Sequence, residues 1–466
     1  MNDILTLIAD SVCGYPLFII LIGGGLYLFL RSGLISLRRL PEAIKELRRK
    51  SDGEGQISSA QALASVVAAT IGLGNIAGVA IALVVGGPGA IFWMWISAIV
   101  GMATKYHEGV LAIMFRGTDT KGNRRGGTMY IIENGLGAKW KPLALFFALA
   151  GMVGTLCIMN ANQLTEAVTT VFTTPEGLRD SAFLGVLAGA TGLSHAESFR
   201  LLCGIAIAII VALVVLGGIK RIARVASVLV PFMVGIYFLM VTYIIATNFA
   251  MVPQVLGSIF REAFSLDAGI GGLIGVAIIG ARRAALVNDA GVGTASIMHG
   301  ESKNNEPVRE GLIAMLGPSI DSGLVCTLTA LALLLCGDIP AGGDIKGLEM
   351  AMGAFASAIP GGQYLLLVIV LCFGLSSMFS YSFYGRSCAS YLFGEAKSQI
   401  YTYIFILSLI LFAVIPLNAA VAVCDLFYAL MTIPTMIAVI SLSGKVRKAS
   451  REYFNRKKEE SAPTEK

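Results

Sequence analysis

Long apolar segments recur along the whole chain, and they constrain its fold more than any other feature of the sequence. A transmembrane helix needs about 20 mostly apolar residues, and about eleven segments of this chain meet that requirement. Only 14% of the 466 residues are charged, against about 25% in soluble domains. The sequence therefore predicts an all-α polytopic membrane protein. The expected spans are residues 15–34, 58–85, 88–115, 142–172, 199–218, 225–249, 268–297, 310–336, 363–384, 401–417 and 419–442.

Basic residues cluster in alternate loops between these segments, which indicates membrane topology and gives no reason to expect a nucleic-acid partner. The loop after the first span is rich in arginine and lysine from Arg31 to Lys50. Because positively charged loops stay in the cytoplasm, we expect the N-terminus outside and the C-terminus inside. The eight cysteines mostly lie in apolar segments without metal-binding spacing, and we expect no organic cofactor.

Without the first span, ten spans divide into two sets of five whose leading helices run in opposite directions, because five is odd. The leading helix of the first set contains Gly72-Leu73-Gly74, and each glycine weakens a helix by roughly 1 kcal/mol. The leading helix of the second set is expected to be interrupted by Gly269, Gly271, Gly272, Gly275 and Gly280. Interruptions at matching positions of two inverted halves indicate the binding site of a secondary transporter. Glycines that serve only close helix packing are the alternative interpretation.

This division predicts four parts. Residues 1–50 form an extra N-terminal helix with a basic cytoplasmic loop, 51–249 the first five-helix repeat, 250–442 the second repeat, and 443–466 a charged cytoplasmic tail. Residues 451–466 are charged enough to be expected disordered. Residues 173–195 form an outside loop in which a short helix can form.

An interrupted helix exposes backbone groups that can bind a charged solute inside the membrane. Free N–H groups at a helix start suit a carboxylate, and free carbonyls at a helix end suit a cation. The amides expected to face an anionic group are those of Leu73, Gly74 and Asn75. The groups expected to face a cation are the carbonyls of Ala68, Thr70 and Ile71 and the side chains of Thr70 and Asn75.

Polar side chains in two other spans are candidates for the same site. Asn160 and Gln163 share one face of the fourth span, whereas Asn162 points about 160° away from Asn160. In the ninth span, the hydroxyls of Ser376 and Ser377 could complete the oxygen shell of a hard cation. Side chains that only hold neighbouring helices together are the alternative for both groups.

Asp321 is a carboxylate inside the eighth expected span, and an intramembrane carboxylate is a functional hypothesis by default. It could relay protons or hold a gate, and pairing with a neighbouring hydroxyl or arginine is an equal alternative. Lys105, His107 and Glu108 are expected near the cytoplasmic interface, where long side chains reach water. The chain has no His–Asp–Ser or metal constellation and no pore-lining ring, so we expect neither an enzyme nor a channel.

The second and third spans contain two runs with a recognisable pattern, Ala69-Thr70-Ile71-Gly72-Leu73-Gly74-Asn75-Ile76-Ala77-Gly78 and Gly86-Gly87-Pro88-Gly89-Ala90-Ile91-Phe92-Trp93. Further runs are Gly217-Gly218-Ile219-Lys220, Val230-Pro231-Phe232, Ile320-Asp321 and Tyr384-Gly385-Arg386. Spread over most of the chain, they resemble the signature of the bacterial alanine or glycine:cation symporters, the sodium:alanine symporter family.

The resemblance implies a LeuT-type inverted-repeat fold in the bacterial inner membrane and sodium-driven uptake of a small neutral amino acid such as alanine or glycine. Sodium would bind the carbonyls of Ala68 and Ile71 and the hydroxyls of Ser376 and Ser377. The amino-acid carboxylate would bind the backbone around Gly72, Leu73 and Gly74. The polar residues and glycines named above complete the expected substrate site, which is Thr70, Gly72, Leu73, Gly74, Asn75, Asn160, Gln163, Gly271 and Gly272. The family usually has Thr at the position of Leu73 and Gln at that of Asn160, which bears on the substrate. Proton coupling through Asp321 is the alternative mechanism.

Overall fold

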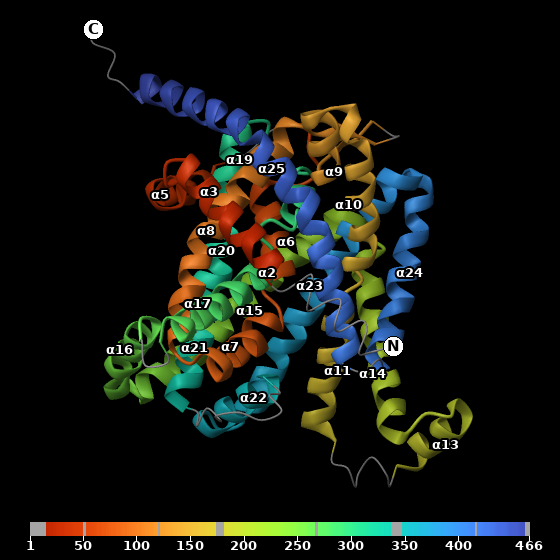
Figure 1. The fold of residues 1–466 in the computed structure, drawn as a ribbon. Helices are drawn as coiled ribbons and strands as arrows, with labels where there is room; N and C mark the ends of the chain where they lie inside the picture. The colour runs from red at the N-terminus through yellow and green to blue at the C-terminus, as the bar shows by residue number, and fades with distance from the viewer. Residues whose placement is uncertain are drawn as a thin grey trace.

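The computed structural model describes residues 15–49, 53–119, 122–173, 181–265, 269–336, 347–414 and 417–461. Within these ranges the chain is almost entirely helical, and its strands β1 (Gly117–Thr118) and β2 (Arg124–Arg125) form one antiparallel hairpin. The helices stand together as a bundle, and the last helix, α25 (Leu417–Ser461), passes along it and projects beyond it (Figure 1). We call the end from which it projects the α25 end.

Helices occupy all the expected spans. The first span corresponds to α2 (Tyr15–Phe18), η1 (Ile19–Gly23) and α3 (Gly24–Arg31). The next five correspond to α6 (Ser59–Thr70) with α7 (Val79–Gly86), α8 (Gly89–Met114), α10 (Lys141–Gly154) with α11 (Ile158–Phe172), α14 (His195–Val215) and α15 (Gly218–Thr247). The other five correspond to α17 (Gly269–Asn288) with α18 (Thr294–His299), α19 (Pro307–Ala314) to α21 (Cys326–Cys336), α23 (Gly362–Phe393), α24 (Glu395–Val414) and α25. Among the described residues, 7 helices are apolar and long enough to cross a membrane, or 8 with the bent pair α6–α7.

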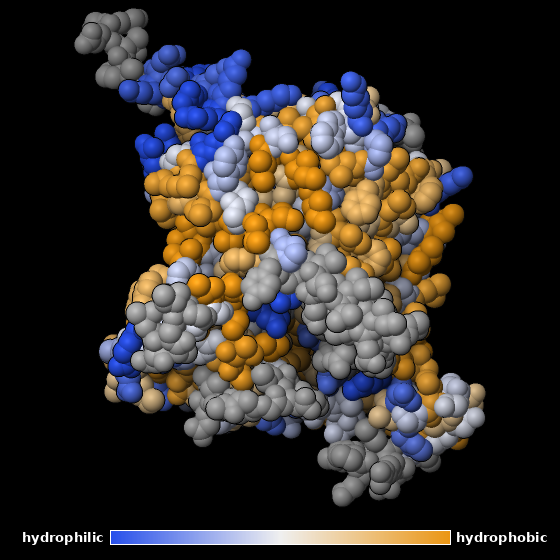
Figure 2. Space-filling model, in the orientation of Figure 1, coloured by the Kyte–Doolittle hydropathy of each residue, from blue (hydrophilic) through white to orange (hydrophobic). Residues whose placement is uncertain are grey.

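The outer surface of the bundle is apolar over a broad band, with polar side chains gathered at the α25 end (Figure 2). Large apolar side chains project from it, among them Leu213, Val228 and Leu239, which are 67%, 70% and 67% exposed. Soluble proteins do not expose apolar surface on this scale. The band therefore faces lipid, and the chain is a multi-pass membrane protein.

Several helices lie outside the spans. α13 (Ala182–Thr191) falls within the loop where a short helix was expected, whereas α16 (Val252–Ala263) and α22 (Gly347–Ala358) were not expected. The predicted disorder of residues 451–466 is wrong as far as Ser461, because α25 continues to that residue. Residues 462–466 lie outside the described part.

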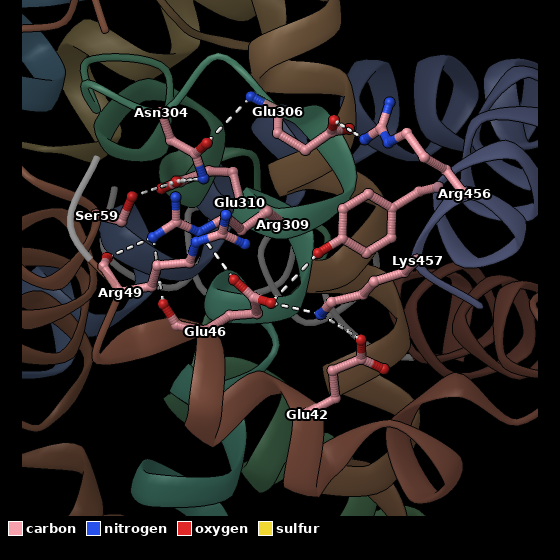
Figure 3. Close-up of polar contacts among 11 residues, drawn as sticks. Glu42, Glu46, Arg49, Ser59, Asn304, Glu306, Arg309, Glu310, Arg456 and Lys457 are labelled. Atoms are coloured by element: carbon pink, nitrogen blue, oxygen red, sulfur yellow. Dashed lines mark hydrogen bonds and ion pairs between the residues drawn. The ribbon is translucent and has the colours of Figure 1, made fainter. Parts of the chain in front are cut away.

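Ion pairs explain why the end of α25 is ordered (Figure 3). Lys457 contacts two carboxylates of α5 (Leu40–Leu47), and its Nζ lies 2.7 Å from Oε1 of Glu42. The second of these carboxylates, Glu46, also lies 3.0 Å from Nε of Arg309 in α19. Burial alone would raise the pKa of the Glu46 carboxyl, but Lys457 and Arg309 hold it below its ordinary value. The charges that suggested disorder are thus paired with the bundle.

At the same end, the segment before α6 is joined to the segment after α18. Gln56 donates from Nε2 to Oε2 of Glu301 at 2.8 Å. The buried Glu310 carboxylate accepts from Ser59 Oγ at 2.7 Å and contacts His299 Nδ1 at 2.6 Å. These contacts close the bundle between the α25-side halves of the two leading helices.

The stability of this closure is expected to fall as the pH rises toward 7. Burial raises the pKa of Glu301 to about 7, although Arg125 opposes the shift. Because the folded-state pKa lies above the unfolded value of 4.5, the native state binds the proton more tightly between these values and loses stability as pH rises. Glu301→Gln keeps the polar contact without the titration. The wild-type melting temperature should decrease from pH 5 to 8 relative to that of Glu301→Gln, and parallel profiles would contradict this prediction.

Candidate functional site

The predicted break in the second span is present and sharp. The helix axis bends by 57° between α6 and the segment Gly74–Gly86, and Ile71 adopts an extended ψ of 97°. Asn75 stabilises the bend, because its side-chain Oδ1 accepts from the Gly72 backbone N–H at 2.9 Å. The N–H groups of Leu73 and Gly74 make no hydrogen bond within the described part of the chain. Two adjacent amides are therefore available at the start of the short helix η2 (Gly74–Gly78), as an anion site requires.

The structure brings Ser376 and Ser377 of the ninth span to this break. Ser376 Oγ donates to the Ala68 carbonyl at 3.0 Å, and Ser377 Oγ lies 3.3 Å from the same carbonyl and 3.0 Å from that of Ala69. A Cβ at Gly72 would lie 3.1 Å from Ser377 Oγ, so the glycine permits this close approach. Hydroxyl and carbonyl oxygens are the ligands that hard cations prefer. A role for the Ile71 carbonyl stays a prediction.

Asp321 also lies at the break, which the sequence did not indicate. It belongs to η6 (Ser319–Val325), a π-helical turn within the eighth span, and is fully buried. Its Oδ1 accepts a hydrogen bond from Asn75 Nδ2, and Thr70 is a close neighbour of the same carboxyl group. Asn75 thus links the broken backbone to the intramembrane carboxylate.

The seventh span is interrupted, but the predicted position of the interruption was wrong. α17 is continuous from Gly269 to Asn288, so Gly271 and Gly272 lie in its first turn, roughly 25 Å along the helix from its end. A Cβ at Gly280 would lie 2.2 Å from the Ala90 carbonyl oxygen, so that glycine serves close packing on α8. Small residues at helix contacts are usual in membranes.

The break lies between Asn288 and Thr294 instead. Asp289, Gly291 and Gly293 have positive φ values of 52°, 90° and 95°. This left-handed backbone ends α17 and lets α18 begin in a new direction. Gly291-Val292-Gly293 repeats the spacing of Gly72-Leu73-Gly74, and this is the signal that could have located the break.

The two interrupted helices meet at Val287, the residue before Asn288. Its Cγ2 would lie 3.5 Å from a Cβ at Gly74 and 3.8 Å from one at Gly78. The first break therefore packs against the end of α17. Both breaks belong to one region, although neither of the seventh-span glycines predicted to bind substrate lies there.

The prediction that charged residues of α8 reach water is wrong. Lys105 and Glu108 are both fully buried. Glu108 Oε1 accepts from the backbone N–H of Gly291 at 2.7 Å, and Lys105 is the cation nearest to it. On the other side of the second break, Asp289 Oδ2 accepts from the Tyr381 hydroxyl at 2.8 Å. Glu108 thus satisfies a backbone group that the broken helix exposes.

The fourth span separates its polar residues as predicted. Asn162 is buried and donates to the Phe412 carbonyl of α24 at 3.3 Å, a contact between helices. Gln163 lines a cavity of about 70 Å³ with Ala77 and Ile81 of the broken helix and Glu166 of its own helix. Asn160 is half-buried and does not line this cavity. This cavity therefore joins Gln163 to the second span, whereas Asn160 lies outside its lining.

Comparisons with known proteins identify the family to which the chain belongs. The model of the Sodium:alanine symporter family matches residues 1–466. The chain is 36% identical to the "Sodium/alanine symporter AgcS" of Methanococcus maripaludis over 96% of both chains. It is 37% identical to an uncharacterized transporter of Haemophilus influenzae, over 98% of this chain and 97% of the relative.

A solved structure with the same fold is that of MhsT in complex with L-phenylalanine. It matches with a TM-score of 0.59 and 16% identity, and covers 84% of this chain and 89% of MhsT. The likeness shows the fold, which is of the LeuT type. This chain is a member of the sodium:alanine symporter family, whose proteins are membrane transporters and not enzymes.

Proposed function

We propose that this protein is a sodium-coupled symporter that imports a small neutral amino acid, such as alanine or glycine, by alternating access. The observation that carries the proposal is the pair of hydroxyls, Ser376 and Ser377, on the carbonyls of Ala68 and Ala69. The free amides of Leu73 and Gly74 follow Ala69 in the same broken helix. A cation site and an anion site are thus adjacent on one broken helix.

In this proposal, sodium binds the carbonyls of Ala68 and Ile71 and the two serine hydroxyls. The substrate carboxylate binds the amides of Leu73 and Gly74, which the positive end of the following helix dipole supports. Thr70, Gly72, Asn75, Asn160 and Gln163 are proposed to surround the rest of the substrate. Gly271 and Gly272 are not proposed again, because they lie at the far end of α17.

Alternating access requires that one end of the bundle open while the other closes. The positive-inside rule places the α25 end in the cytoplasm of a bacterial cell and the N-terminus outside. Residues 51–249 and 250–442 are proposed as the two inverted repeats. The contacts of Glu301 and Glu310 then hold the cytoplasmic side shut, and inward opening requires them to separate.

Uptake into proteoliposomes tests the substrate. Sodium-dependent uptake of labelled alanine, competed with each of the twenty amino acids, should be reduced by small neutral amino acids and unaffected by charged ones. Leu73 is fully buried and carries no hydroxyl, so the site favours an apolar side chain. If no amino acid competes, the substrate proposal fails.

Proton coupling through Asp321 is the second candidate, and the hydrogen bond between Asp321 and Asn75 favours it. Asp321→Asn removes the titratable group with little change in volume. If protons drive transport, this variant should lose accumulation under an imposed pH gradient. If sodium alone drives transport, wild-type uptake should follow the sodium gradient and ignore a pH gradient of the same size.

A further inference from the structure

A basic cleft opens at the α25 end of the bundle. It has a volume of about 360 Å³ and lies between the chain that follows α3 and the final turns of α25. Figure 1 shows α3 and α5 beside this part of α25. The cleft is lined by five arginines, Arg31, Arg38, Arg39, Arg447 and Arg451, and by no acidic residue.

Most of these arginines have no counter-charge. Arg39 lies 3.1 Å from Glu42 and stacks 4.0 Å from the Phe454 ring centroid. No carboxylate pairs with the other four within the described part of the chain. Nε of Arg31 is buried without a hydrogen-bond partner. Several guanidinium groups left unpaired around one cavity repel one another, so the cleft is built for an anion.

The surroundings of the cleft are apolar on the side of α3. Leu26, Leu30 and Leu37 are 45%, 61% and 56% exposed. In Figure 2 the apolar band gives way to polar side chains toward this end. A ligand with an anionic group in the cleft and hydrocarbon along these leucines would match both surfaces. Free inorganic phosphate would contact only the arginine-lined cleft and not the leucines.

We propose that this cleft binds the phosphate headgroup of an anionic phospholipid. Arginine guanidinium groups bind phosphate oxygens in a bidentate manner, and basic pockets between membrane helices on the cytoplasmic side hold anionic headgroups. Arg31 is the last residue of α3 and Arg38 follows that helix, whereas Arg447 and Arg451 belong to α25. The bound lipid thereby bridges the extra N-terminal helix and the last helix of the second repeat.

Binding of labelled phosphatidylglycerol to the purified full chain in detergent tests this inference. The double variant Arg38→Gln with Arg447→Gln should weaken binding about 10- to 30-fold, because each basic residue near an anionic headgroup contributes to affinity. The matched control is Arg48→Gln, an exposed arginine of the same region that does not line the cleft. It should bind as the wild type does, and both variants should retain the wild-type elution volume and helix content.

Two further probes identify the source of the phosphate. Phosphatidylcholine should not compete with the labelled lipid, and inorganic phosphate at the same concentration should not displace it. Equal binding by the double variant and the wild type would overturn the proposal, as would an equal loss in Arg48→Gln. Full displacement by inorganic phosphate would overturn the assignment to a lipid.

Discussion

Replacement of both Ser376 and Ser377 with Ala is expected to abolish the sodium stimulation of uptake. The two hydroxyls lie on the carbonyls of Ala68 and Ala69 at the end of α6. A polar contact to a charged group contributes about 1.5–3 kcal/mol, so the loss of two should raise the sodium concentration for half-maximal uptake about 100-fold or more. The measurement is initial uptake of alanine as a function of sodium concentration.

Ser382→Ala is the matched control for this double variant. Ser382 is buried on the same helix, and among the described residues its hydroxyl bonds only to the Phe379 carbonyl, one turn earlier. It should retain the wild-type sodium dependence. A double serine variant with unchanged sodium dependence would place the cation elsewhere.

Glu108→Ala is expected to remove transport and to destabilise the protein by about 1–3 kcal/mol, the usual cost when a buried hydrogen-bond donor loses its acceptor. The variant leaves the Gly291 N–H without an acceptor and Lys105 without its neighbouring carboxylate. The second break would then lose the side chain that holds its backbone in place. Thermal unfolding and uptake measure the two effects separately.

Glu108→Gln separates the effect of the hydrogen bond to Gly291 from the effect of the carboxylate charge. The glutamine oxygen can still accept from Gly291, so the break should keep its geometry and the variant should fold. Recovery of transport in Glu108→Gln would show that the hydrogen bond is what matters. If Glu108→Ala transports normally, the second break does not depend on this contact.

The first break could be predicted because its cause is local. Gly72 and Gly74 weaken the helix where they stand, and Asn75 supplies the cap within the same turn. Ser376 and Ser377 could also be predicted, since adjacent hydroxyls in an apolar helix have few other partners. Their position beside the Ala68 carbonyl was predicted from the family resemblance, because the sequence alone does not determine which helices are in contact.

The position of the second break could not be predicted from how many glycines the seventh span contains. Gly271, Gly272 and Gly280 lie in a continuous helix because membrane helices use glycine for close contact as readily as for a break. The break follows from the positive φ of Gly291 and Gly293, and the glycine spacing marks it more reliably than glycine density. The burial of Lys105 and Glu108 was not predicted either, because charged residues near the end of a predicted span were expected to reach water at the membrane interface.

Accumulation of alanine against its own gradient is the most direct test of sodium coupling. Proteoliposomes containing the wild-type protein, with sodium outside and potassium inside, should concentrate labelled alanine above the external level. The overshoot should vanish when an ionophore collapses the sodium gradient, and it should be absent when potassium replaces sodium on both sides. Accumulation of equal size without a sodium gradient would contradict sodium-coupled symport.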